Sequence, residues 1–240
     1  MEALLRWNSP VYGMVFPGEF TSLAEENGMI VPIGEWVLQE ACRQTLEWQS
    51  KGLQDITVSV NVSMEQFHKR DFCRTVNHVI DTSGLSPNHL VLEITESLMM
   101  ENAEKHIQTL HELKALGVKL SIDDFGTGYS SLSYLTRFPV DELKIARSFV
   151  TNIHKDPEHA AVGRAIIAMA QSLGLRVVAE GVEEAGPLNF LIERGCDLIQ
   201  GYYYSKPLTK DQLPKFVCAM KGYLEDRSLP ARGKNLGLTG

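Results

Sequence analysis

AEKHIQTLHELKALGVKLSIDD, residues 103–124, contains in one stretch the pattern that decides the fold. Apolar residues spaced by three and four over 103–116 predict a helix. Gly117 follows at the point where helices commonly end in a left-handed residue. The apolar and β-branched run 118–123 then predicts a buried strand that ends in acids. A helix that leads directly into a buried strand is one unit of an alternating α/β fold.

The same alternation recurs along the chain. Further strands are expected at residues 57–61, 90–95, 142–145, 176–179 and 198–200, with 2–7 as a candidate seventh. Further helices are expected at residues 33–49, 72–82, 160–173, 187–194 and 213–224. Such alternation predicts parallel strands joined by crossover helices, and both a closed (β/α)₈ barrel and an open doubly wound sheet fit it. Seven strands are one short of a barrel.

Composition narrows the class of protein. The 240 residues are 44% hydrophobic and 22% charged, which is ordinary for a globular protein. The net charge of −7 argues against a nucleic-acid duplex or an anionic membrane as the main partner. No transmembrane run or signal peptide is found, and the four cysteines show no CxxC spacing, which favours free thiols and a cytoplasmic domain. One domain is expected over residues 1–225, followed by a disordered tail at 226–240.

Polar side chains occur at the ends of successive predicted strands. In a parallel barrel the carboxyl ends of all strands open on one face, where barrel enzymes carry their sites. Several carboxylates crowded there need cations to compensate them, and all-oxygen ligands favour Mg²⁺ or Mn²⁺. Adjacent aspartates suit a pair of ions, an arrangement typical of phosphoester hydrolysis. The residues are Asn61, Glu93, Asp123, Asp124, Lys144, Glu180 and Gln200.

Simpler interpretations exist for each residue. A single acid after a strand is usually a helix cap or a solvated loop residue, and only the recurrence raises this set above that expectation. The run 126–128 (GTG) fits a phosphate-binding loop or merely a tight turn. Lys144 could form a Schiff base in an aldolase-like barrel, but a lysine among carboxylates stays protonated and is a poor nucleophile. Five histidines fall in helical or linking segments rather than at strand ends and are expected to be surface or core residues: His68, His78, His106, His111 and His159.

Six motifs resemble the EAL domain of bacterial cyclic di-GMP phosphodiesterases. They are EALLRW at 2–7, VNVS at 60–63, EITES at 93–97, DDFGTGYSS at 123–131, AEGVE at 179–183 and QGY at 200–202. The resemblance implies a TIM-like (β/α)₈ barrel whose first strand runs against the others. It also implies hydrolysis of one phosphodiester of cyclic di-GMP to linear pGpG with two Mg²⁺ or Mn²⁺ ions, Ca²⁺ being inhibitory.

The resemblance also implies a set of metal ligands. The six residues are Glu2, Asn61, Glu93, Asp123, Asp124 and Glu180. One ion would be held by Glu2, Asn61, Glu93 and Asp123. The second ion would be held by Asp123, Asp124 and Glu180, so Asp123 would contact both ions.

Further roles follow from the same motifs. Lys144, Glu180 and Glu183 resemble the catalytic group, with Lys144 near the attacking water or the phosphate and Glu183 steadying the site. Arg6 and Gln200 resemble contacts to substrate phosphate and guanine, respectively. The segment 125–131 resembles the family loop that links metal binding to dimerisation.

Two departures from the family pattern stand out. Residues 143–146 read LKIA where the family usually has LKID, so Ala146 replaces an acid and predicts slower turnover. The chain also begins at the EAL motif, without the segment that carries the usual first strand. The expected partners are cyclic di-GMP, a second copy in a homodimer, and fused sensor or GGDEF domains in a longer protein that could be membrane-anchored. The rival interpretation is a catalytically weak receptor for cyclic di-GMP.

Overall fold

The computed structural model describes residues 1–100, 102–128, 132–226 and 237–239. They fall into two compact units. The first comprises residues 1–121 and 137–139, and the second comprises residues 122–136 and 140–240. Strand β5 (Lys119–Phe125) begins in the first unit and ends in the second.

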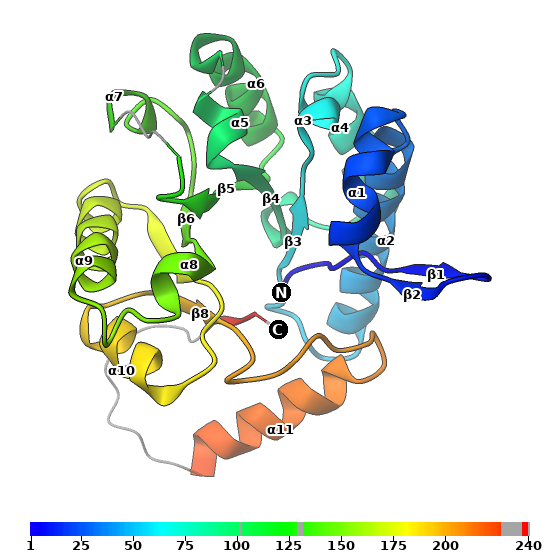
Figure 1. Ribbon diagram of the computed structural model, residues 1–240. Coiled ribbons are helices and arrows are strands. Elements are labelled where there is room, and N and C mark those ends of the chain that lie inside the picture. The colour runs from blue at the N-terminus through cyan, green and yellow to red at the C-terminus, as the bar shows by residue number, and fades with distance from the viewer. Residues whose placement is uncertain (101, 129–131, 227–236, 240) are drawn as a thin grey trace. The chain divides into compact units, whose positions relative to one another are not determined.

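The first unit is built on the parallel strands β3 (Val58–Asn61) and β4 (Leu90–Thr95) (Figure 1). Asn61 lies opposite Glu93 in their register. The first five residues of β4 are buried, as expected for a strand covered on both faces. The helices of this unit are α1 (Pro17–Glu26), α2 (Ile30–Ser50), α3 (Met64–Phe67), α4 (Phe72–Ser83), the 3₁₀ turn η1 (Pro87–His89), α5 (Glu96–Met100) and α6 (Ala103–Ala115).

The amino-terminal residues differ from the prediction of a strand over residues 2–7. Only Glu2 forms a β-bridge, in parallel with Ser59, and the chain then leaves the sheet. Residues Trp7–Ser9 (β1) pair instead with Gly13–Val15 (β2) in an antiparallel hairpin that projects from the unit (Figure 1). The tight turn between these two runs competes with continued pairing to β3, so the candidate seventh strand was wrong beyond its first residue.

The second unit contains four parallel strands in the order β6 (Glu142–Ile145), β7 (Arg176–Ala179), β8 (Leu198–Gln200) and β9 (Gly237–Thr239). The first three have the bounds that the sequence predicts. The helices of this unit are α7 (Leu132–Leu135), α8 (Arg147–Val150), α9 (Pro157–Ser172), α10 (Ala185–Glu193) and α11 (Leu213–Asp226).

Strand β9 lies within the segment for which a disordered tail was expected. Gly237, Leu238 and Thr239 pair with Leu198, Ile199 and Gln200 of β8. An unpaired strand edge presents a row of free N–H and C=O groups, and these groups explain why a short segment adds here. Residues 227–236 and 240 lie outside the described part of the chain, so the expected disordered tail over residues 226–240 stays a prediction.

A glycine near the start of α2 leaves room for a side chain of α3. A Cβ atom at Gly34 would lie 2.0 Å from Nε2 of Gln66, so no larger residue fits without moving that side chain. Gln66 and Ser63 form a capping box at the start of α3, with the Gln66 amide N–H donating to Ser63 Oγ at 3.3 Å. Because Ser63 follows Asn61 by only two residues, α2 supports the turn beyond β3.

Candidate metal site

Three carboxylates converge in the second unit. Asp123 and Asp124 lie at the end of β5, and Glu180 directly follows β7. An oxygen atom from each lies within 4.8 Å of the others. Asp123 is buried, Glu180 is half-buried and Asp124 is exposed, so the group is open to solvent on one side. The structure thus brings together three of the predicted ligands.

A buried lysine lies among these acids. Lys144, in β6, is 1% exposed, and its Nζ is 2.5 Å from Glu180 Oε1 and 3.3 Å from Asp123 Oδ1. Two neighbouring carboxylates favour the ammonium form, which is a poor nucleophile. The formal charges of these four groups, three carboxylates and one ammonium, sum to −2. One divalent cation would match that sum.

The backbone conformations of the two aspartates at the end of β5 differ from each other. Asp124 has φ +52°, in the left-handed region that aspartate and asparagine tolerate best among non-glycine residues. Its backbone N–H donates to Asp123 Oδ1 at 2.9 Å. Thr127 Oγ1 donates to the Asp124 carbonyl at 2.8 Å and closes the turn. This conformation lets consecutive residues contribute carboxylates to one cluster.

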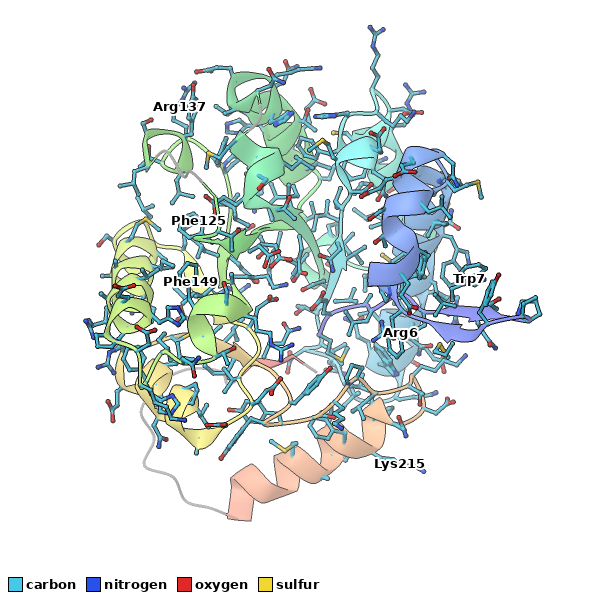
Figure 2. The ribbon with its side chains drawn as sticks, viewed as in Figure 1. Arg6, Trp7, Phe125, Arg137, Phe149 and Lys215 are labelled. Carbon is cyan, nitrogen blue, oxygen red and sulfur yellow. The ribbon has the colours of Figure 1, made fainter. Side chains whose placement is uncertain are left out.

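The glycine of the turn is held by an aromatic ring. Gly126 has φ +99°, and a Cβ atom there would lie 2.9 Å from Cε2 of Phe149. Phe149 belongs to α8 and is labelled in Figure 2. Of the two interpretations left open for the GTG run, this packing favours a tight turn for its first glycine.

Ala146 does not extend strand β6. The strand ends at Ile145, and Ala146 is the N-cap of α8 with ψ 140°. It is 2% exposed, and its N–H donates to the Phe125 carbonyl at 3.4 Å. Ala146 therefore adjoins the turn that carries Asp123 and Asp124, but its side chain has no carboxylate.

Sequence reasoning missed Arg147 as a partner of Glu183. Arg147 Nη2 lies 2.7 Å from Glu183 Oε1, and its side chain lies over Gly181, where a Cβ atom would be 2.3 Å from Arg147 Cγ. Both charged side chains are well exposed, so the ion pair contributes little to stability. It does connect the residues after β6 with those after β7. The signal available in the sequence was the basic residue Arg147, directly after Ala146.

The first unit holds a second group of predicted ligands. Asn61 Nδ2 donates to Glu2 Oε1 at 2.7 Å, and Glu93 lies opposite Asn61 in the sheet. Directly opposed residues in a sheet project to the same face. Glu93 is 3% exposed. The structure thus gathers Glu2, Asn61 and Glu93, and the prediction that they share an ion with Asp123 stays a prediction.

The two predicted substrate contacts have other interactions in the structure. Arg6 Nη1 donates to the Leu5 carbonyl at 2.8 Å, and the guanidinium lies 5.1 Å from the centre of the Phe16 ring. Figure 2 shows Arg6 near the base of the hairpin. Gln200 ends β8, and its carbonyl accepts the Val182 N–H at 3.0 Å. The predicted contacts of Arg6 with substrate phosphate and of Gln200 with guanine stay predictions.

The donor set of the acidic cluster fits a hard divalent cation. All candidate donors are carboxylate oxygens, the ligands that Mg²⁺ and Mn²⁺ prefer. Parallel strands with crossover helices and carboxylates at the strand ends define the class of barrel-like α/β domains that can bind such ions at the carboxyl face.

Comparisons with known proteins specify this class further. The EAL domain model matches residues 1–207, and the chain belongs to the EAL domain family. Its fold is the TIM-like barrel fold of that family. The chain is 46% identical over 213 residues to the bifunctional diguanylate cyclase/cyclic di-GMP phosphodiesterase MucR of Pseudomonas aeruginosa, covering 89% of this chain and 31% of MucR.

Two further matches agree. The cyclic di-GMP phosphodiesterase NbdA of Pseudomonas aeruginosa is 43% identical over 235 residues, covering 98% of this chain and 30% of NbdA. The solved structure of PaMucR phosphodiesterase in its c-di-GMP complex has a TM-score of 0.86 at 46% identity, covering 88% of this chain and 86% of that one. The chain spans less than a third of the length of the curated relatives that it matches. Within the described residues, no helix combines the length and the apolar character needed to cross a membrane.

Proposed function

We propose that this domain hydrolyses one phosphodiester bond of cyclic di-GMP to give linear pGpG. The observation that carries the proposal is the group of three carboxylates with oxygen atoms within 4.8 Å of one another, two of them beside the buried ammonium of Lys144. The names of MucR and NbdA, both described as cyclic di-GMP phosphodiesterases, support the choice of substrate.

Asp123, Asp124 and Glu180 would hold a divalent cation, and Glu2, Asn61 and Glu93 are the proposed further ligands for a two-ion site. When bound, Mg²⁺ or Mn²⁺ would lower the pKa of a coordinated water and stabilise negative charge on phosphoryl oxygens. Lys144 keeps its proton between Asp123 and Glu180 and orients both carboxylates. The proposed contribution of Glu183 is to steady the residues that follow β7, where it pairs with Arg147 of α8.

A second candidate function is a cyclic di-GMP receptor with weak hydrolysis. The observation that favours it is Ala146, a buried residue that adjoins the aspartate turn through Phe125 and offers no carboxylate where the family usually has an aspartate. Removing an acid that is not a direct ligand is expected to slow the chemical step more than it weakens binding.

The remaining parts of the proposal concern context. We expect a cytoplasmic domain that forms a homodimer and belongs to a longer signalling protein. The bifunctional description of MucR, of which this chain covers 31%, supports fusion to a diguanylate cyclase domain.

The test is product analysis after incubating the purified chain with cyclic di-GMP and Mn²⁺, Mg²⁺ or Ca²⁺. Formation of pGpG with Mn²⁺ or Mg²⁺ but poorly with Ca²⁺ is expected, because Ca²⁺ accepts longer and looser coordination. Calorimetry on the same samples measures binding. Tight binding without any product would favour the receptor, and absence of both would contradict both functions.

A further inference from the structure

Two histidines of the first unit meet outside the acidic cluster. His68 is the C-cap of α3 and His106 belongs to α6. Their Nε2 atoms lie 3.2 Å apart, and their ring centres are 5.3 Å apart. The two residues are 38 positions apart in the chain, so the fold rather than local sequence brings them together.

The pair is rigid on one side and accessible on the other. His106 is 2% exposed, and the Phe67 ring packs edge-on against it at 5.1 Å with an interplanar angle of 89°. Phe67 is itself buried. His68 is exposed. The pair thus joins one buried and one exposed imidazole, and the contact between them is partly buried.

The electrostatic setting of His106 favours its neutral ring. Burial, and then the neighbouring His68, lower the pKa of His106, while hydrogen bonds to the backbone at Leu98 and Met99 raise it and Lys105 lowers it further. Nδ1 of His106 is buried. If the ring carries its proton on Nδ1, the Nε2 lone pair is directed to His68, and neutral imidazole is the form that binds metals.

The spacing of the nitrogens suits a shared ion. With each Nε2 about 2.05 Å from a common ion, a separation of 3.2 Å corresponds to an N–metal–N angle of about 100°, close to tetrahedral. Imidazole nitrogen is a borderline donor that suits Zn²⁺ and Cu²⁺ rather than Mg²⁺. Among the described residues the one group of three close histidine, cysteine or acidic ligands is the Asp123–Asp124–Glu180 cluster, so water would complete the coordination at the histidines.

We propose that His68 and His106 form a binding site for a divalent transition metal ion, Zn²⁺ or Cu²⁺, separate in ligand chemistry from the acidic cluster. A bound ion would connect α3 to α6. These helices lie shortly after β3 and β4, the strands that carry Asn61 and Glu93. The ion would thereby tie together the segments that follow two predicted ligands of the other site.

The test uses the full chain carrying Cys218→Ser, which removes an exposed thiol, in buffer with saturating Mg²⁺ to occupy the acidic cluster. Calorimetry with Zn²⁺ measures stoichiometry and affinity. Electron paramagnetic resonance of the Cu²⁺ form counts the nitrogen ligands. His68→Asn removes one ligand at an exposed position and is not expected to impair folding, which circular dichroism checks. His111→Asn is the matched control, a single exposed histidine on α6.

One Zn²⁺ per chain and a Cu²⁺ spectrum with two nitrogens are expected. His68→Asn should weaken Zn²⁺ binding at least about tenfold and leave one nitrogen, because a lost ligand matters no less than a lost supporting contact. His111→Asn should change neither result. Equal Zn²⁺ affinity in the parent and His68→Asn proteins, or a parent Cu²⁺ spectrum with fewer than two nitrogens, would overturn the proposal.

Discussion

The acidic cluster of the second unit and the histidine pair of the first unit are both polar centres, but they differ in charge balance. The cluster gathers three carboxylates and one ammonium, whose formal charges sum to −2. The pair places two imidazoles 3.2 Å apart, and these can satisfy each other with one shared proton. The cluster is therefore expected to be destabilised without a cation, whereas the pair is stable without one.

This difference teaches that donor chemistry, rather than clustering alone, indicates the ion. Oxygen donors with excess negative charge favour hard ions, and neutral nitrogen donors favour transition metals. It also gives each centre its own readout, since catalysis and Mg²⁺ stabilisation should depend on the acids, and Zn²⁺ or Cu²⁺ binding on the histidines.

Asp123→Asn should have the largest effect of any single substitution in the acidic cluster. Loss of a buried carboxylate that is predicted to contact both ions should lower the rate of pGpG formation at least about a hundredfold. Chromatography of the product measures the rate, and chelation of the metals in the unmodified chain should reproduce the loss. Undiminished hydrolysis in a metal-free sample would contradict the dependence of hydrolysis on a cation at the acidic cluster. Zn²⁺ affinity at the histidine pair serves as an internal control for folding.

Ala146→Asp should raise the hydrolysis rate by about ten- to a thousandfold, each factor of ten lowering the barrier by about 1.4 kcal/mol. The position adjoins the aspartate turn, so an added acid would act on the transition state more than on substrate binding. Ala146→Asn is the matched control, because asparagine caps α8 as well as aspartate does but adds no charge. Equal rates for the two variants would assign any gain to capping, and equal rates for all three proteins would show that residue 146 is unimportant.

Gly126→Ala should weaken metal binding and destabilise the domain by about 1–3 kcal/mol, because φ +99° strains any larger residue and its Cβ would meet Phe149. Gly174→Ala is the control for strain alone, since Gly174 has φ +71° with nothing within 4 Å of a Cβ atom. Denaturant unfolding and Mg²⁺ titration of both variants separate the two causes. A Gly126→Ala protein that matches Gly174→Ala in both measurements would mean that Phe149 does not hold the turn.

The smallest of the expected effects is the change in melting temperature on metal binding. Mg²⁺ at about 100 times its Kd adds about 2.7 kcal/mol of stability, or roughly 5–10 °C for a domain of this size. Asp124→Asn should raise the melting temperature of the metal-free protein by relieving repulsion and should reduce the response to Mg²⁺. Asparagine tolerates the left-handed backbone at residue 124, so the variant adds no strain. A lower melting temperature for Asp124→Asn without metal would contradict the expected repulsion.

The sequence predicted the parts of the fold that depend on local pattern. Strands at residues 90–95, 142–145, 176–179 and 198–200 have the predicted bounds, because continuous apolar runs mark buried parallel strands. The hairpin at β1 and β2 was missed, since its exposed residues show no alternation that distinguishes it from a loop.

The candidate site was predictable in membership but not in conformation. Recurrence at strand ends indicated Asp123, Asp124, Lys144 and Glu180, and the structure brings these four together. The left-handed backbone at Asp124 depends on its own turn, and no periodic pattern encodes it. The sequence also did not indicate that the residue after the strand at 142–145 is the N-cap of α8.

The contact between Gly34 and Gln66 has a consequence for genetic selection. Gly34 lies in the interior of a 21-residue helix, where glycine is unfavourable and random substitution would ordinarily be tolerated or even improve the helix. Here a Cβ atom would displace the side-chain amide of Gln66, whose Oε1 accepts the N–H of Ser63, the N-cap of α3. A saturation screen for signalling in living cells should therefore find position 34 intolerant, and a suppressor of Gly34→Ala should arise at Gln66 as a shorter residue.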